Sequence, residues 1–419
     1  GSTPGVDAPS TPRSVSDDRQ PPSARLEEVL EGTVISNSSG SFFLVRREYS
    51  ATHRHGDLSL GAILAEPPQA AAWISDDITL VGMDWRETLF LDTETTGLAG
   101  GAGTVCFLIG IGKFTSSATF RLDQCFLRDY DDEGAMLQFI GEEYPAPSAL
   151  VSYNGKSFDL PLLRSRHVQQ RASFPWKHTP HFDLVHAVRR IWKRRLGDCS
   201  LGHVETRLLG VHRSGDVPGA MIPRIWLDFI SQGNPYPLRP VFYHHRMDIL
   251  SLVTLAGYLA RSLGEADGRG LMDTEDRLSL LKQSIRKRDY ERAVQVADSL
   301  LEDEVSPLAR RKVYELRCLA LRRLGRAVEY VDGLWAWHRA FPEDPRAAYT
   351  LAGVLASARN LLLARQICEQ TLGVVQSAGS FYRDMAEQPE RLRLEDRLRR
   401  ICARLEKCPD SGESLDLDI

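Results

Sequence analysis

The sequence has few cysteines, and none of them lie in a close pair. Its 419 residues include 7 Cys, an odd number, and no Cys-x-x-Cys motif occurs. An odd count without such pairs argues against a disulfide framework and against a zinc site built from cysteines. We therefore expect reduced thiols and a cytoplasmic protein.

Long apolar runs are also missing. No stretch of about 18 apolar residues occurs, so no membrane span is predicted. The N-terminus lacks the charged-then-apolar pattern of a secretory signal. The net charge is only −4, which neither requires nor excludes nucleic acid, because a basic surface can be local. Composition and net charge therefore do not identify what the protein binds, and only local motifs can indicate it.

The length exceeds that of one ordinary globular core and predicts two or three domains. Residues 1–24 are rich in Ser, Pro and Asp with few apolar groups, and we expect a disordered tail there. Short β-type runs such as 41–45 predict a small β-rich element over residues 25–85. Its loop at His53 and His55 is expected to be solvated.

A mixed pattern of strands and helices follows over residues 86–265. The predicted strands are 89–91, 105–111, 120–127 and 149–153, and the predicted helices are 131–145, one from about 158, 184–196, 200–209 and 239–262. Mixed strands and helices of this kind indicate an α/β domain with a central mixed sheet and helices on its faces.

The last third of the chain is predicted to contain only helices. Three of them carry an alanine near the start, and these residues, Ala293, Ala327 and Ala364, are spaced by 34 and then 37 positions. A period near 34 is typical of tetratricopeptide repeats, whose units are stable only when stacked. We expect such repeats over residues 270–407, with an irregular helical bundle as the alternative, and an acidic disordered tail over 408–419.

Two acids stand at the end of a predicted strand. Asp92 and Glu94 follow the apolar run 89–91, and alternate residues of a strand face the same way. Two carboxylates this close raise each other's pKa unless a cation lies between them. Because oxygen ligands suit Mg²⁺ or Mn²⁺, the pair predicts a metal site. Two acids at a solvated strand end would give the same pattern.

Two further acids lie later in the same region. Asp159 follows a strand and an Asn-Gly turn at the start of a predicted helix, where an acid can also serve as a cap. Asp248 lies four residues after His244, so the two share one helix face, as a solvated ion pair would also do. A histidine beside a carboxylate and a metal can deprotonate water. Two cations about 3.5–4 Å apart, held by four carboxylates, can catalyse phosphodiester cleavage.

Four stretches of the sequence resemble the motifs of one nuclease family. They are residues 92–112, 150–166, 181–205 and 243–252. In this order they resemble the DEDD (DnaQ-like) exonucleases of the ribonuclease H-like superfamily, and more narrowly the bacterial YprB-type ribonuclease H-like proteins. The resemblance covers roughly residues 87–262, and this family often adds a tetratricopeptide-like C-terminus.

The resemblance implies a mixed five-stranded sheet flanked by helices, and a site for two Mg²⁺ or Mn²⁺ ions. It implies that Asp92 bridges both ions. Glu94 and Asp248 would complete one ion site, and Asp159 would serve the other.

The general base of the family falls on His244 or Tyr243 in this sequence. The position that holds tyrosine in one subclass holds His244 here, and the position that holds histidine in the other holds Tyr243. We favour His244, because an imidazole titrates near neutral pH and a phenol does not. The family signature also includes Asp183, which we expect to cap the following helix or to support the site.

Several residues are predicted to contact nucleic acid. A basic cluster follows Asp183 with Trp192 within it, and such cations neutralise phosphates while an aromatic ring stacks on a base. A solvated helix face is the alternative, and for Trp192 itself we expect burial. Phe158 and Leu98 flank the proposed site, and in related exonucleases such residues touch the terminal bases; burial in the core is the alternative for both. The predicted nucleic-acid-binding residues are Thr95, Leu98, Asn154, Phe158, Arg190, Lys193 and Arg194.

These features predict a two-metal 3′–5′ exonuclease that hydrolyses single-stranded nucleic acid, with DNA favoured over RNA. Two alternatives stay open: a nucleic-acid- or protein-binding scaffold with a vestigial nuclease fold, and a structure-specific endonuclease. The motif does not reveal contacts at the 2′-hydroxyl, on which discrimination between DNA and RNA depends. The helical repeats are expected to recruit a protein partner or to extend the substrate channel.

Overall fold

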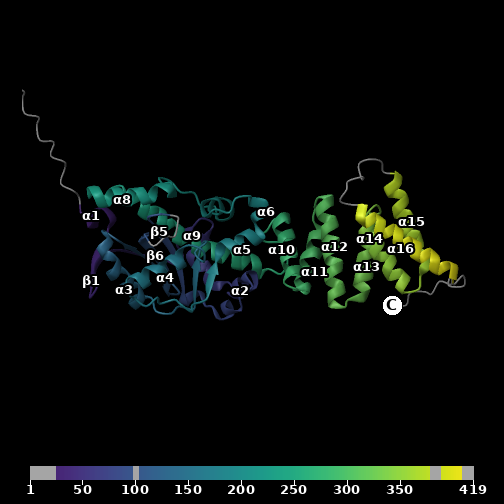
Figure 1. Ribbon diagram of the computed structural model, residues 1–419, viewed down its shortest axis with the longest axis horizontal. Coiled ribbons are helices and arrows are strands. Elements are labelled where there is room, and N and C mark those ends of the chain that lie inside the picture. The colour runs from purple at the N-terminus through teal and green to yellow at the C-terminus, as the bar shows by residue number, and fades with distance from the viewer. Residues whose placement is uncertain (1–24, 98–102, 378–387, 408–419) are drawn as a thin grey trace, which may run out of the picture.

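The computed structural model describes residues 25–97, 103–377 and 388–407. The molecule is elongated, with a sheet and its covering helices at one end and a row of helices at the other (Figure 1). The predicted tails, 1–24 and 408–419, and the predicted nucleic-acid contact Leu98 lie outside the described residues. No helix in the described part of the chain is long and apolar enough to cross a membrane.

One seven-stranded mixed sheet within the described residues forms the centre of the first end. Its strand order is β1-β2-β7-β6-β5-β8-β9. The strands are β1 (Thr33–Asn37), β2 (Gly40–Ser50), β5 (Thr88–Thr95), β6 (Cys106–Ser116), β7 (Thr119–Phe126), β8 (Ala149–Ser152) and β9 (His181–Asp183). Neighbours from β1 to β5 run antiparallel, whereas β5, β8 and β9 run parallel. The predicted mixed sheet is confirmed.

The expected number of five strands is wrong, because the N-terminal hairpin extends the sheet. Strand β2 pairs with β7 from Phe43 opposite Phe126 to Ser50 opposite Thr119. The run 42–45 on β2 is buried on both faces of the strand and belongs to the same core as β6 and β7. The predicted β-rich element thus adds two strands to the central sheet.

The rest of residues 25–85 is mostly helical, which the sequence analysis did not predict. It contains α1 (Leu26–Leu30), the short strands β3 (Arg54–His55) and β4 (Leu58–Ser59), α2 (Gln69–Ser75), and the 3₁₀ turns η1 (Leu60–Ala65) and η2 (Ile78–Gly82), with η3 (Trp85–Glu87) just after them. These elements are short and show no clear periodicity. Their buried residues, such as Leu60 and Ile63, pack into the same core as Leu252, so tertiary contacts stabilise them.

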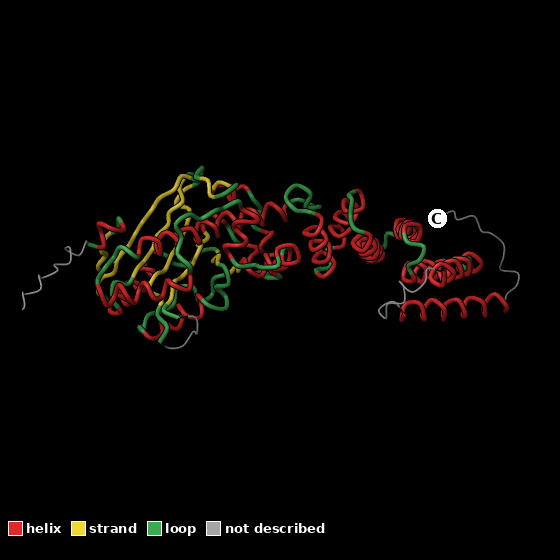
Figure 2. Tube along the Cα trace, turned by 90° about the horizontal axis from the view of Figure 1, so that it is seen from above, coloured by secondary structure: helices red, strands yellow, loops and turns green. Residues whose placement is uncertain are grey.

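Helices cover both faces of the sheet (Figure 2). They are α3 (Glu133–Glu143), α4 (Asp159–Gln169), α5 (Leu184–Ile191), α6 (Lys193–Leu196), α7 (Leu201–Val204), α8 (Ile222–Gln232) and α9 (Leu238–Gly264). Helix α8 and strand β9 were not predicted, and residues Glu205–Leu209 form a π-helical turn, η5. Phe90 of β5 packs on the side of α9, whereas Leu89 and Leu91 pack on the side of α3 and α4.

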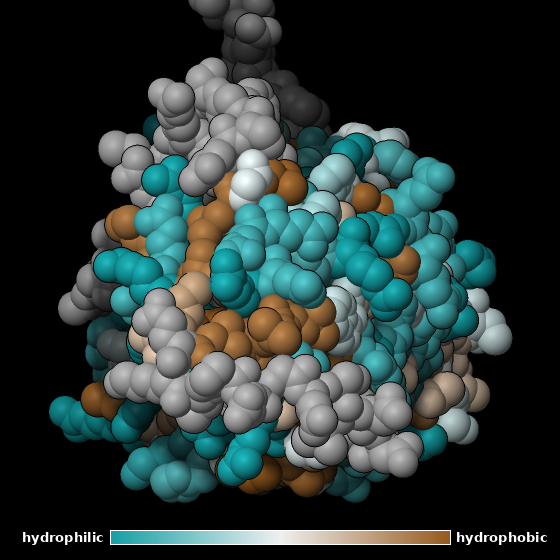
Figure 3. Space-filling model, turned by 90° about the vertical axis from the view of Figure 1, so that its right-hand side faces the viewer, coloured by the Kyte–Doolittle hydropathy of each residue, from teal (hydrophilic) through white to brown (hydrophobic). Residues whose placement is uncertain are grey.

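The row of helices at the other end confirms the predicted all-α C-terminal region. Its members are α10 (Thr274–Arg286), α11 (Tyr290–Glu302), α12 (Pro307–Leu324), α13 (Ala327–Ala340), α14 (Pro345–Ser357), α15 (Leu361–Ser377) and α16 (Gln388–Lys407). Neighbouring helices pack on one another along the row. Figure 3 looks onto the far end of the row and shows apolar surface between hydrophilic stretches. That these helices are tetratricopeptide-like repeats stays a prediction.

The predicted alignment of the three alanines is wrong at its middle member. Ala293 and Ala364 are each the fourth residue of a helix, α11 and α15, and both are fully buried. Ala327 is instead the first residue of α13 and is exposed. Tyr330 is the fourth residue of α13, so it is the structural equivalent of the two buried alanines.

The apolar core continues from the sheet into the first helices of the row. Leu280 of α10, Leu300 of α11 and Leu321 of α12 belong to the same core as Leu252 of α9. A separate core lies among α13 to α16. The predicted domain boundary near residue 270 stays a prediction, but apolar packing does not stop there.

We expect Gly110→Ala to lower the melting temperature. Gly110 of β6 lies against α9, and a Cβ atom there would lie 2.5 Å from Cε1 of His245 and 2.8 Å from Cδ1 of Ile249. Such overpacking typically costs about 1–3 kcal/mol. Gly141→Ala in α3, where nothing lies within 4 Å of the added atom, is the control. It should leave stability unchanged or raise it, and equal melting temperatures for the two variants would contradict the packing described.

Candidate active site

Strand alternation places the first two predicted acids on the side of α9. Phe90 packs on that side, and Asp92 and Glu94 follow it at intervals of two residues. Thr93 points the other way, toward the start of α4, and its hydroxyl donates a hydrogen bond to the carboxylate of Asp159. Acidic side chains therefore lie on both faces of β5, with Asp92 and Glu94 on one face and Asp159 on the other.

Helix α9 brings a histidine and an acid to the strand. Glu94, His244 and Asp248 each offer one ligand atom, and these atoms all lie within 4.8 Å of one another. Nε2 of His244 is 3.4 Å from Oδ2 of Asp248, one turn further along the helix. Two carboxylates and an imidazole form a donor set that fits a divalent cation. Asp92 and Asp159 lie near this group but outside that three-ligand set.

The acids of the site strongly disfavour one another's ionised form. Burial, together with the charges of Asp248 and Asp159, raises the pKa of Glu94 to about 8. Burial likewise raises the pKa of Asp92 well above its ordinary value, with Asp248 the next cause. Burial raises the pKa of Asp159 to about 6 even though the hydrogen bond from Thr93 lowers it. A divalent cation would relieve this repulsion, so the donor set fits Mg²⁺ or Mn²⁺.

A single carboxylate holds the loop that leads to Asp159. Asp183 caps α5 by accepting a hydrogen bond from the N–H of Val185 at 3.2 Å. It also accepts from the N–H of Asn154 at 2.7 Å and from the N–H of Lys156 at 3.1 Å. Asp183 thus caps the following helix and fixes the turn that precedes α4, so both roles considered for it are present.

A pocket of about 510 Å³ opens beside Asp92 and Asp159. Of the predicted nucleic-acid contacts, Thr95, Asn154 and Phe158 line it. Phe158 is 52% exposed, so most of its ring is free to contact a ligand. An exposed aromatic beside a group of acids is the arrangement that a base-stacking contact needs.

The predicted basic contacts lie elsewhere. Arg190, Lys193 and Arg194 are not among the described residues that line this pocket. Arg190 and Lys193 donate hydrogen bonds to backbone carbonyl groups, and Arg194 lies 3.7 Å from Glu275 of α10. Each of the three thus has a contact within the protein, and their binding of nucleic acid stays a prediction. Trp192 is fully buried, as expected.

Of the two candidates for the general base, His244 reaches the acids. Its Nδ1 lies 2.9 Å from Oδ1 of Asp216, and its Nε2 faces Asp248. Tyr243 instead lies with its ring 5.4 Å from the guanidinium of Arg246. The geometry favours His244 for the role, which stays a prediction.

His245, the neighbour of His244, was not predicted to take part in the site. It is fully buried, and its Nε2 lies 3.1 Å from the carbonyl oxygen of Asp92. Its Nδ1 lies 3.1 Å from Nε2 of Gln124. Because the carbonyl only accepts, Nε2 carries the proton, and burial lowers the pKa of this imidazole to about 4. A neutral His245 therefore holds the strand beneath Asp92 without adding charge.

Three charged residues of the site were not predicted to take part in it, although Glu205 ends the family-like stretch 181–205. Glu205, Arg213 and Asp216 come from the π-helical turn η5 and from the loop that follows it. Arg213 donates a hydrogen bond to Asp248 and another to Glu205. Only the fold brings this segment to α9, so no local spacing could have identified these residues.

Comparison with known proteins agrees with this fold. Residues 89–260 match the family model described as the RNase_H superfamily. The chain carries a ribonuclease H-superfamily domain. A relative, the uncharacterized protein YprB of Bacillus subtilis (strain 168), is 32% identical over 267 residues, which are 62% of this chain and 63% of that protein. The chain spans less than two thirds of that relative. The two matches confirm the predicted resemblance to YprB-type ribonuclease H-like proteins.

The limits of the ribonuclease H domain explain the number of strands. The match begins within β5 and ends within α9, so it contains β5 to β9 and excludes the hairpin β1–β2. Strands β5 to β9 are the five strands that the family resemblance implies. All four predicted acids and His244 lie inside the matched residues.

Binding of Mg²⁺ should tighten as the pH rises from about 6 to about 8. Below its pKa of about 8, the carboxyl group of Glu94 holds a proton that a cation must displace. The affinity should change by up to about tenfold per pH unit for each displaced proton. Titration calorimetry in two buffers of different ionisation enthalpy measures the protons released.

Glu94→Gln is the control for this measurement, because it removes the titrating group. It should bind Mg²⁺ more weakly and release fewer protons than the natural protein. A Mg²⁺ affinity that stays constant over this pH range would show that Glu94 is not a ligand of the cation.

Proposed function

We propose that this protein is a divalent-metal-dependent 3′–5′ exonuclease that hydrolyses single-stranded nucleic acid, with DNA favoured over RNA. The observation that carries the proposal is the convergence of Glu94, His244 and Asp248 beside Asp92. Asp92 and Asp159 also line a pocket that the exposed ring of Phe158 borders. The polarity and the two-ion requirement rest on the family resemblance.

The acids would hold two cations in the arrangement that the resemblance implies. Glu94 and Asp248 would serve one ion, Asp159 the other, and Asp92 both. Bound Mg²⁺ or Mn²⁺ supplies charge that lowers the pKa of a water molecule and stabilises the leaving oxygen. The burial that raises the pKa of Glu94 also excludes bulk water, which strengthens electrostatic interactions at the scissile phosphate.

His244 would accept the proton of the attacking water, and its Nε2 would in that case not be a ligand of the cations. Its Nδ1 donates to Asp216, which orients the ring and leaves Nε2 directed toward Asp248 and the ligand group. An imidazole oriented by a carboxylate is a common general base. Hydrolysis then breaks one phosphorus–oxygen bond, adds the oxygen of water to phosphorus and returns the proton to the leaving group.

Loss of a metal-binding acid should abolish hydrolysis. We expect Asp92→Asn to reduce Mn²⁺-dependent release of nucleotides from a 3′-labelled strand by about a hundredfold or more. Asp131→Asn, an exposed acid outside the site, is the matched control and should keep full activity. DNA and RNA strands labelled at either end separate the polarity and the preferred substrate.

A circular single strand decides between exonuclease and endonuclease, because an exonuclease has no end from which to start. Cleavage of the circle would overturn the proposed mode of action in favour of endonuclease activity. If the natural protein cleaves neither linear nor circular strands of DNA or RNA, the scaffold alternative replaces the proposal.

Phe158 should contribute to substrate binding more than to chemistry. Base stacking on an aromatic ring is worth about 1–3 kcal/mol, so Phe158→Ala should raise the KM roughly tenfold with kcat nearly unchanged. Phe158→Trp keeps an aromatic face and should retain a KM near that of the natural protein. Steady-state kinetics on a short single strand measures both, and an unaltered KM in Phe158→Ala would exclude stacking at this position.

A further inference from the structure

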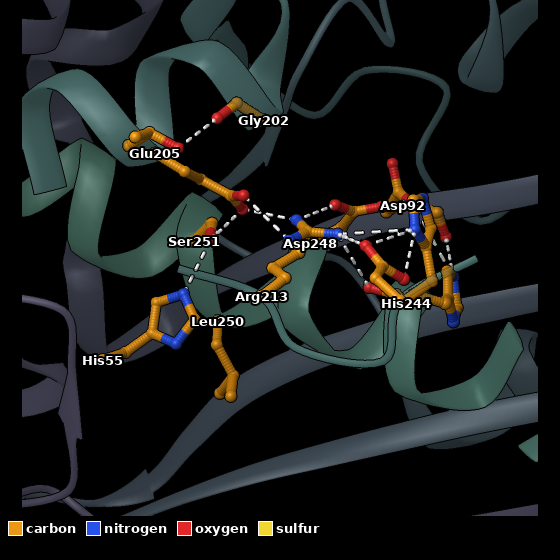
Figure 4. Close-up of polar contacts among 12 residues, drawn as sticks. His55, Asp92, Gly202, Glu205, Arg213, His244, Asp248, Leu250 and Ser251 are labelled. Atoms are coloured by element: carbon orange, nitrogen blue, oxygen red, sulfur yellow. Dashed lines mark hydrogen bonds and ion pairs between the residues drawn. The ribbon is translucent and has the colours of Figure 1, made fainter. Parts of the chain in front are cut away.

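One buried cation lies among the acids of the site. Arg213 follows the π-helical turn η5, and its side chain is only 11% exposed. Figure 4 shows its guanidinium between Glu205 on one side and Asp248 on the other. A guanidinium keeps its charge in proteins, so this position is permanently positive.

Three carboxylates surround this guanidinium. Its Nη2 donates to Glu205 and to Asp248, its Nε lies 2.8 Å from Oε2 of Glu205, and its Nη1 lies 3.3 Å from Oδ2 of Asp216. Burial alone would lower the pKa of Arg213, but Asp248 and Glu205 raise it further than burial lowers it. Three acids on one cation leave a local excess of negative charge.

Asp248 is shared between Arg213 and the candidate metal ligands. Its Oδ1 accepts a hydrogen bond from Arg213, and its Oδ2 lies 3.4 Å from Nε2 of His244. Arg213 also lowers the pKa of Glu94 and Asp92, against the effect of burial and of their acidic neighbours. The guanidinium therefore acts on the same carboxylates that a divalent cation would neutralise.

Contacts from distant parts of the chain fix the position of Arg213. Glu205 accepts a hydrogen bond from the hydroxyl of Ser251 on α9, and the Oγ of Ser251 lies 2.7 Å from Nε2 of His55 on β3. Because the hydroxyl proton goes to Glu205, His55 must be the donor to Ser251. His55 is buried, so the expected solvated loop is wrong here, and burial lowers the pKa of His55 to about 4.

We propose that Arg213 is the resident counter-ion of the metal site. It supplies part of the positive charge at Asp248 when no cation is bound, and it weakens the attraction of the site for a cation. Because its hydrogen bonds hold Arg213 in place, it stays beside Asp248 when a cation binds. The two positive charges then compete for this carboxylate. The inference rests on the metal site of the proposed function but not on nuclease activity.

The test measures Mn²⁺ binding by titration calorimetry and by the rise in melting temperature that Mn²⁺ produces. We expect Arg213→Met to lower the melting temperature of the metal-free protein, because three acids, of which Glu205 and Asp248 are buried, lose their counter-ion. The same variant should bind Mn²⁺ more tightly, by roughly five- to tenfold, since coupling between two bound charges is reciprocal. Its melting temperature should therefore rise more with Mn²⁺ than that of the natural protein.

Two further variants distinguish the effect of the lost charge on Mn²⁺ binding from a general loss of stability. Arg213→Lys keeps the positive charge without the planar fork and should bind Mn²⁺ with nearly the natural affinity. Arg277→Met removes another buried arginine, 4% exposed and paired with Asp303 far from the site. It should lower the melting temperature as well, but leave the Mn²⁺ affinity unchanged.

Two outcomes would overturn the inference. One is an Arg213→Met variant that binds Mn²⁺ no more tightly than the natural protein, and the other is a natural protein that binds no Mn²⁺. If Arg213→Met does not fold, Arg213→Gln is measured in its place with the same expectation. A protein that binds Mn²⁺ as described but cleaves no nucleic acid would refute the proposed function and leave the role of Arg213 intact.

Discussion

Repulsion among buried carboxylates is the constraint on which the rest of this site depends. Burial raises the pKa of Asp92 and Glu94, and each further acid raises it more, so the group resists full ionisation without added positive charge. Helix α9 nevertheless packs closely on β5 and β6, and this packing keeps the acids together. Gly110 permits this close approach, because any side chain there would overlap the imidazole of His245.

Neighbouring groups support this arrangement in ways that do not increase the repulsion. His245 is neutral and holds the backbone of Asp92, while Asp183 fixes the turn before Asp159 through backbone N–H groups. Arg213 adds one fixed positive charge. The protein's own groups therefore hold the acids in this arrangement.

The parts outside the ribonuclease H domain are joined to it by packing. The hairpin β1–β2 continues the sheet beyond β7, and α10 to α12 share a core with α9. Two basic residues of α6 contact α10 at this junction: Arg195 pairs with Asp276 at 2.8 Å, and Arg194 lies 3.7 Å from Glu275. The near end of the helical row is consequently held in a fixed position relative to the acids.

Sequence alone determined those features that depend on local periodicity. Alternation along β5 predicted the common face of Asp92 and Glu94, and the four-residue spacing on α9 predicted the contact of His244 with Asp248. Helical periodicity likewise predicted the all-α C-terminal region. Only the tertiary structure decided that Arg213 would lie among these acids, that two more strands would join the sheet, and that Arg194 and Arg195 would lie beside acids of α10. Such contacts join residues far apart in the chain, and no local spacing records them.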